Sequence, residues 1–269
     1  MCYGLKPNII KKNIPNIITL LNLLSGVIAV MFAANNDLVT AAIFALIGIF
    51  FDFFDGLVAR LLNVQSELGL QLDSLADVVT SGVVPGIVMF QLLMRSVNQK
   101  SFEASFFEKY TTVENTETMI WTGFKFQPIQ LLPFVGLLLT VFAAYRLAKF
   151  NLDERQTSSF IGLPTPAMAL FVLSLPVILA YSANDFIINL ISNIYFLVSV
   201  VLVFSFLMNT EIPLFSLKFK NFSLKNNFIE LLFLVLSITL VLIFNIVSIP
   251  LIIITYVILS LVKISLFKK

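Results

Sequence analysis

Residues 52–77 of the 269-residue chain read DFFDGLVARLLNVQSELGLQLDSLAD, and this stretch decides the fold. It carries four acids inside two long apolar runs: Asp52, Asp55, Asp73 and Asp77. One aspartate near the centre of a membrane-spanning helix costs about 2.5 to 3.5 kcal/mol on insertion. Four unpaired aspartates would cost on the order of 10 kcal/mol, so something must compensate for their burial.

The composition places the chain in a membrane, because 59% of its residues are hydrophobic and only 12% are charged. Apolar runs of about 20 residues recur, each long enough to cross a hydrocarbon core about 30 Å thick. Backbone groups in lipid must be satisfied internally, so we predict an all-α, polytopic bundle of about eight transmembrane helices. The predicted helices cover residues 14–34, 39–62, 68–94, 129–150, 166–181, 186–208, 228–244 and 249–267. Seven helices are the alternative, since only residues 245–248 separate the last two.

We predict one membrane domain, with a core of about six helices in residues 1–208. Residues 209–269 would add a cytoplasmic connector and two further helices. With the N-terminus inside and eight crossings, thirteen Lys and Arg residues fall inside and four outside. This asymmetry predicts that both termini lie in the cytoplasm. Residues 95–127 should form an outside loop, with a partly helical segment as the alternative.

Residue types that are missing narrow the chemistry. The chain has no histidine and a single cysteine, Cys2, which excludes imidazole bases, Ser-His or Cys-His nucleophiles and zinc sites built from His or several Cys. The basic residues are scattered at helix ends, so no nucleic-acid footprint is present. Proton transfer and metal binding therefore fall to Asp and Glu.

Helical geometry brings the acids together. Asp52 and Asp55 share one face of their helix, while Asp73 and Asp77 are spaced i, i+4 on the next. At 1.5 Å per residue, Asp52 lies about 12 Å before Arg60, and Asp77 lies about 12 Å after Gly69. A hairpin between the two helices would therefore place Asp52 and Asp77 at the same depth. Converging carboxylates need a cation, and oxygen ligands select Mg²⁺, Mn²⁺ or Ca²⁺.

Other readings of the acids remain open at this point. Intramembrane carboxylates also serve proton relays and ion pathways, or pair with a cation such as Arg60. A cation-coupled transporter is therefore the alternative from another functional class. Small residues near the acidic faces favour a phosphate-sized ligand instead, because they leave room beside the carboxylates: Gly56, Ala59 and Gly69.

The stretch resembles the signature of CDP-alcohol phosphatidyltransferases, Asp-x2-Asp-Gly-x2-Ala-Arg-x8-Gly-x3-Asp-x3-Asp, at every fixed position. The resemblance extends over residues 14–167. Within the family, these residues resemble the phosphatidylserine synthase branch. Three further segments carry it: Pro15-Asn16-x2-Thr19-x2-Asn22-x3-Gly26, residues 146–151 and residues 162–167. Lys149 departs from the pattern, since arginine is expected there.

The resemblance implies that the four aspartates bind one or two divalent metal ions, Mg²⁺ or Mn²⁺, at the pyrophosphate of CDP-diacylglycerol, and that Asp77 is the general base. The polar residues of the first helix would face the nucleotide, and Arg60 would bind phosphate together with the small residues named above. These polar residues are Asn16, Thr19 and Asn22. Helix-packing hydrogen bonds are the alternative role for the three, and a topology signal is the alternative for Arg60.

L-serine is the expected acceptor, which would give phosphatidylserine and CMP. Its carboxylate needs a cation, for which we expect Arg146 or Lys149, and its ammonium needs an acceptor, for which we expect Glu67 or Ser66. Solvated charges at the membrane edge are the alternative. Other acceptors stay open: glycerol 3-phosphate, inositol phosphate or choline. The resemblance also implies a site on the cytoplasmic side of the cell membrane and a homodimer, although no periodicity isolates an interface.

Overall fold

The computed structural model describes residues 7–108, 131–152, 160–215 and 228–267. The all-α expectation is confirmed, because these residues form helices and one ribbon of two two-residue strands. The elements are α1 (Pro7–Ala34), α2 (Leu38–Leu61), α3 (Glu67–Asp77), the π-helix η1 (Val78–Val83), α4 (Val84–Glu108), the 3-10 helix η2 (Leu132–Leu137), α6 (Leu138–Leu152), β1 (Phe160–Ile161), α7 (Thr165–Tyr181), α8 (Asp185–Ile191), α9 (Ile194–Asn209), β2 (Pro213–Leu214), α10 (Phe228–Phe244), the 3-10 helix η3 (Asn245–Val247) and α11 (Ser248–Phe267).

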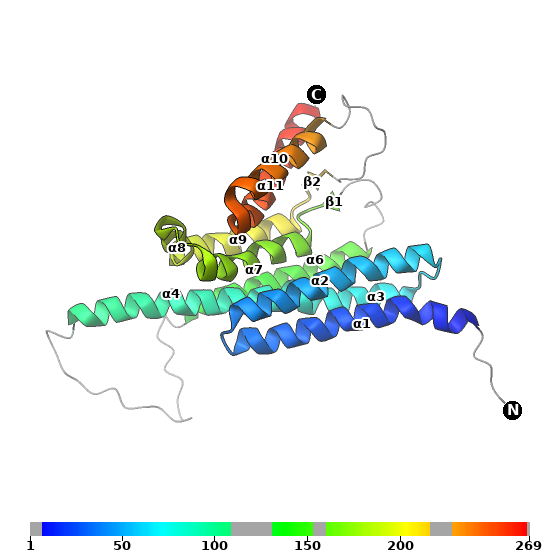
Figure 1. The fold of residues 1–269 in the computed structure, drawn as a ribbon, viewed down its shortest axis with the longest axis horizontal. Coiled ribbons are helices and arrows are strands. Elements are labelled where there is room, and N and C mark those ends of the chain that lie inside the picture. Colours follow the sequence, from blue (N-terminus) through cyan, green and yellow to red (C-terminus); the bar gives the residue numbers. More distant parts are fainter. Residues whose placement is uncertain (1–6, 109–130, 153–159, 216–227, 268–269) are drawn as a thin grey trace.

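Helices α1 and α2 form a hairpin and run side by side (Figure 1). Asp37 begins α2, since its carboxylate accepts a hydrogen bond from the Thr40 backbone N–H at 3.2 Å. Both helices bury alanines that have no solvent exposure: Ala29, Ala33, Ala41, Ala42 and Ala45. Small side chains let helix backbones approach closely in a membrane, where the hydrophobic effect between helices is absent.

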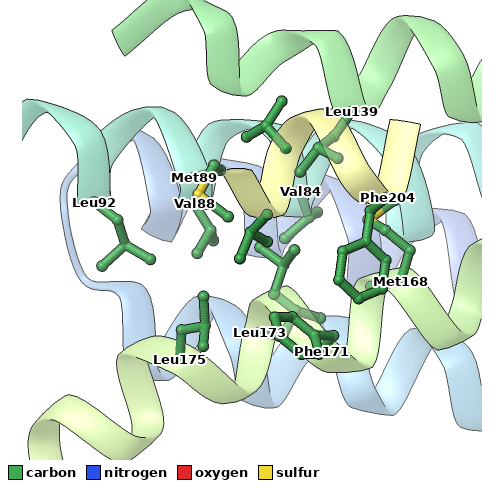
Figure 2. Packing of buried hydrophobic residues seen from close by; sticks show 14 of the residues in the cluster. Val84, Val88, Met89, Leu92, Leu139, Met168, Phe171, Leu173, Leu175 and Phe204 are labelled. Carbon is green, nitrogen blue, oxygen red and sulfur yellow. The ribbon is translucent and has the colours of Figure 1, made fainter. Parts of the chain in front are cut away.

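The apolar core lies where α4, α6, α7 and α9 meet. Figure 2 shows Val88 and Met89 of α4, Leu173 of α7 and Phe204 of α9 in this core. The Phe171 and Phe204 rings have centroids 4.5 Å apart, which joins α7 to α9. Most other large apolar side chains of the helices are exposed, as expected for surfaces that face lipid.

The expected count of eight transmembrane helices is not confirmed. Five helical stretches of the described chain are long and apolar enough to span a membrane, and six if the bent pair α8 and α9 is one span. The axis bends by 62° between α8 and α9, and α7 has only 17 residues. Helices α10 and α11 form a single apolar stretch in sequence, yet Lys263 contacts Glu230, so the second helix folds back along the first.

Part of the segment expected as an outside loop, residues 95–127, is helical, because α4 continues beyond the predicted helix end at residue 94 to Glu108. Arg95 lies on this helix, and its guanidinium donates to the side-chain and backbone oxygens of Asn36, both at 3.0 Å. These bonds hold α4 against the turn between α1 and α2. Residues 109–127 of the expected loop lie outside the described residues.

Candidate active site

The four aspartates lie on two helices that a short turn joins. The chain leaves α2 through Asn63, whose φ of 52° is a left-handed conformation that asparagine tolerates. Ser66 then caps α3, because its hydroxyl accepts a hydrogen bond from the Gly69 N–H at 3.1 Å. The turn reverses the chain, so that α3 packs mainly against α1 while its Asp73 lies close to Asp52 and Asp55 of α2.

Three of the aspartates form a compact group. Asp52, Asp55 and Asp73 each offer one carboxylate oxygen, and these oxygens lie within 4.8 Å of one another. Asp55 is 5% exposed, whereas Asp52 and Asp73 are half-buried. Carboxylates this close repel strongly in a medium of low dielectric constant unless a cation or protons lie between them.

Asp77 lies beside this group and not within it. It is the last residue of α3, and its carboxylate interacts electrostatically with those of Asp52 and Asp73. The side chain of Asn22, from α1, adjoins it as well. The expected convergence of α2 and α3 therefore yields a three-carboxylate cluster with a fourth acid next to it.

Helix α1 contributes the polar wall of the site. The Thr19 hydroxyl lies 2.5 Å from Oδ2 of Asp55 and 3.1 Å from the Pro15 carbonyl oxygen. Asn22, one turn further along, is completely buried. Thr19 and Asn22 thus both lie on the side of α1 that faces the acids, Thr19 next to Asp55 and Asn22 next to Asp77.

A cavity of about 510 Å³ opens next to the acids and is large enough for a nucleotide-sized group. Asp55 and Asp73 line it together with most of the residues expected to bind nucleotide and phosphate: Asn16, Thr19, Gly56, Ala59, Arg60 and Gly69. Asn22 does not line it. A Cβ placed on Gly56 would meet nothing within 4 Å, so this glycine leaves part of the cavity free.

Arg60 is exposed at the cavity wall, and its Nε donates to the Gly56 carbonyl at 3.0 Å. That bond leaves the remaining guanidinium N–H groups for other partners. Ser66 and Glu67 line the same cavity. Gln65 and Val64 also line it, although the sequence analysis gave neither a binding role. Val64 and Gln65 directly precede Ser66, the N-cap of α3, and this position in the turn was the sequence signal that could have indicated their place at the cavity.

The two basic acceptor candidates lie in a different place. Arg146 and Lys149 on α6 line a separate small pocket with Phe150 and Asn209. Arg146 is 7% exposed, lies 5.8 Å from the Phe150 ring centroid and interacts electrostatically with Asp77. Its Nε has no hydrogen-bond partner among the described residues. Lys149 is partly exposed and forms an ion pair with Glu211 at 3.4 Å.

The sequence analysis also missed Thr80, a buried polar residue of η1 whose hydroxyl donates to the side-chain oxygen of Asn22 at 2.8 Å. A threonine and a serine at positions 80 and 81 interrupt an otherwise apolar run, and this was the available signal.

Comparison with known proteins agrees with the acidic signature. The model of the CDP-alcohol phosphatidyltransferase family matches residues 12–206, which include α1 to α4 and all four aspartates. The chain belongs to the CDP-alcohol phosphatidyltransferase family. Within the matched region, the family signature therefore coincides with the carboxylate cluster and its cavity.

Individual members of the CDP-alcohol phosphatidyltransferase family resemble the chain over about three fifths of its length. A Bacillus subtilis protein named CDP-diacylglycerol–serine O-phosphatidyltransferase is 32% identical over 62% of this chain and 80% of its own. A Helicobacter pylori protein of the same name is 30% identical over 59% of this chain, but the match spans only 55% of that protein. An archaetidylserine synthase of Methanothermobacter thermautotrophicus is 26% identical over 60% of this chain and 56% of its own.

Proposed function

We propose that this integral membrane enzyme transfers the phosphatidyl group of CDP-diacylglycerol to L-serine, giving phosphatidylserine and CMP. The observation that carries the proposal is the cluster of Asp52, Asp55 and Asp73, of which Asp55 and Asp73 line a cavity of about 510 Å³. The names of the Bacillus and Helicobacter relatives favour serine as the acceptor.

A divalent metal ion fits the cluster. The available donors are carboxylate oxygens, which suit Mg²⁺ or Mn²⁺, and histidine is absent from the whole chain. The Oδ1 atom of Asp73 is buried and has no hydrogen-bond partner in the described part of the chain. This oxygen is therefore available as a metal ligand. Asp52, Asp55 and Asp73 would hold the metal, and Asp77 would complete the set. When bound, the metal would neutralise the pyrophosphate and stabilise the charge that builds on the CMP leaving group.

The cavity residues would hold the nucleotide half of the donor. Arg60 has guanidinium N–H groups beyond the one bonded to Gly56, and these would bind a phosphate oxygen. Gly56, Ala59 and Gly69 leave space next to the acids for the pyrophosphate. Asn16 and Thr19 on the α1 wall supply polar atoms toward the nucleotide. Asn22 lies deeper, beside Asp77, and its proposed role is with that acid.

Asp77 is the proposed general base. Over the whole reaction, the serine hydroxyl oxygen forms a bond to the phosphorus that carries diacylglycerol, and the bond from that phosphorus to CMP breaks. The hydroxyl proton must leave, and a carboxylate within reach of the acceptor can take it. Asp77 is suited to this role because it lies beside the carboxylate cluster and also interacts with Arg146.

Arg146 is the stronger candidate for the serine carboxylate. It is buried, its Nε lacks a partner among the described residues, and it lies on the side of Asp77. Lys149 is already engaged by Glu211. A buried guanidinium with an unused donor gains most from a carboxylate that arrives with the acceptor. Ser66 and Glu67 line the donor cavity, which is separate from the pocket at Arg146, so we do not propose that they bind the same serine molecule.

The active site is proposed to open to the cytoplasm. The α2–α3 turn and the cavity lie at the end of the bundle where α1 begins (Figure 1). Lys11, Lys12 and Arg60 lie near the ends of α1 and α2 on that side, and Lys and Arg next to membrane helices tend to stay in the cytoplasm. CDP-diacylglycerol would place its nucleotide in the cavity and its acyl chains in the surrounding lipid.

Acceptor dependence tests the proposal directly. Purified protein in detergent would be given CDP-diacylglycerol and Mn²⁺ with L-serine, glycerol 3-phosphate, inositol phosphate or choline in turn, while CMP release is followed. We expect release with L-serine and its loss when EDTA removes the metal. Preference for another alcohol would overturn the serine assignment. Solute uptake into liposomes without CMP formation would instead support a cation-coupled transporter.

A further inference from the structure

Thr80 lies in the π-helix η1, which begins directly after Asp77. A π-turn inserts an extra residue into a helix and rotates the faces on either side of it, and such turns are frequent at functional sites. Here it separates the acidic face of α3 from the apolar α4. Thr80 has no solvent exposure and is therefore a polar group in the interior of the bundle.

The Thr80 hydroxyl fixes the orientation of the Asn22 carboxamide. It donates to Oδ1 of Asn22 at 2.8 Å, so the amide nitrogen must point to the other side. That nitrogen is buried and has no hydrogen-bond partner among the described residues. The Asn22 side chain adjoins the Asp77 carboxylate. The reversed amide would turn an oxygen toward this acid, and two acceptors would then face each other.

The two side chains fill a slot between α1 and α2 that has no spare room. A Cβ on Gly26 would lie 2.5 Å from the Thr80 hydroxyl oxygen. A Cβ on Gly48 would lie 2.7 Å from the Thr80 methyl group and 2.9 Å from Oδ1 of Asn22. Close packing of this kind leaves few alternative rotamers, so the hydrogen bond selects one orientation of the amide.

We propose that Thr80 is a positioning residue for phosphatidyl transfer. It holds the amide N–H groups of Asn22 toward Asp77 and thereby keeps that carboxylate aimed at the acceptor and the metal. The inference rests on the proposed function, in which Asp77 serves as base beside the metal cluster. Removing a residue that hydrogen-bonds to a metal-binding group typically lowers metal affinity or activity about 10- to 100-fold.

The test compares the removal of a hydroxyl at two threonines. Thr80 lies within η1, and Thr140 contacts η1 from α6. Thr80→Val removes the hydroxyl with little change of shape, and Thr80→Ser retains it. Thr140→Val is the matched control, because the Thr140 hydroxyl on α6 donates to the Gly82 carbonyl of η1 at 3.0 Å but does not contact Asn22. Thr80→Ala replaces Thr80→Val if the latter does not give a monodisperse protein.

The readouts are kcat and KM for CMP release, the thermal unfolding midpoint, and Mn²⁺ binding followed by the electron paramagnetic resonance signal of free Mn²⁺. We expect Thr80→Val to lower kcat and weaken Mn²⁺ binding about 10- to 100-fold, with KM for CDP-diacylglycerol little changed. Thr80→Ser and Thr140→Val should stay close to the parent protein in all three.

Two results would overturn the inference. In the first, kcat and Mn²⁺ affinity of Thr80→Val stay within twofold of the parent values. In the second, Thr140→Val loses as much kcat and Mn²⁺ affinity as Thr80→Val, which would reveal a general packing effect. Failure of the proposed function is recognised separately, since the parent protein itself would then release no CMP from CDP-diacylglycerol. In that case the Mn²⁺ titration decides, and an unchanged affinity in Thr80→Val rejects the positioning role.

Discussion

The hydroxyl of Thr19 on α1 lies 2.5 Å from Oδ2 of Asp55 on α2. The Pro15 carbonyl oxygen lies 3.1 Å away, but a hydroxyl has one proton, and the carboxylate is the stronger acceptor. The bond ties the first helix to the buried acid of the cluster. Helix α1 is thus part of the site as well as a packing partner of α2.

Replacing Thr19 by Val should leave Asp55 without its donor. A buried hydrogen bond to a charged group contributes about 1.5 to 3 kcal/mol, so we expect a lower thermal unfolding midpoint of the metal-free protein and slower CMP release. Thr19→Ser, which keeps the hydroxyl, should retain both. An unchanged midpoint in Thr19→Val would show that the contact contributes no stability.

Asp77→Asn should abolish most turnover, because the amide cannot accept the hydroxyl proton. General-base removal typically costs about 10²- to 10⁴-fold in kcat, and the nearly isosteric change should leave the thermal midpoint close to that of the parent. Asp37→Asn is the matched control, since Asp37 only caps α2 and asparagine caps equally well. Near-normal turnover in Asp77→Asn would reject the base assignment.

Gly56→Leu should block the cavity proposed to hold CDP-diacylglycerol without disturbing the fold. A Cβ on Gly56 meets nothing within 4 Å, so the larger side chain would extend into the cavity. We expect KM for CDP-diacylglycerol to rise roughly tenfold or more, while helix propensity keeps the thermal midpoint from falling. Gly56→Ala should have a smaller effect on KM. A parental KM in Gly56→Leu would place the nucleotide elsewhere.

Arg146→Met should weaken serine binding specifically. The loss of a charge-assisted hydrogen bond of about 1.5 to 3 kcal/mol corresponds to a rise of roughly 10- to 100-fold in KM for L-serine. KM for CDP-diacylglycerol should change little. Lys149→Met serves as the control, because Lys149 is paired with Glu211 and partly exposed. An unchanged KM for serine in Arg146→Met would discard the assignment.

The acidic centre could be predicted from the sequence because two simple periodicities determine it. The i, i+3 spacing of Asp52 and Asp55 and the i, i+4 spacing of Asp73 and Asp77 give each helix one acidic face. Equal distances from the α2–α3 turn then place both faces at one depth. Asp77, one turn beyond Asp73 on α3, lies beside the compact group and not within it.

Other features depend on tertiary contacts that a linear pattern does not contain. The 62° bend between α8 and α9 and the shortness of α7 reduce the number of clear spans, although every predicted segment is apolar. The π-helix at Val78–Val83 has no sequence signal beyond Thr80 and Ser81, two polar residues in an apolar run. Arg146 and Glu67 were both expected at the acceptor, and only the packing of α6 shows that they line different cavities.

Direct Mn²⁺ binding tests the central claim most closely, namely that carboxylates of α2 and α3 share a divalent metal inside the membrane domain. Purified protein would be titrated with Mn²⁺ in detergent, with free Mn²⁺ measured by electron paramagnetic resonance, for the parent and for Asp73→Asn. The account predicts saturable binding in the parent, at least tenfold weaker in the variant, together with a metal-dependent rise in the parent's thermal midpoint. Equal binding by the two proteins, or no binding by either, would contradict it.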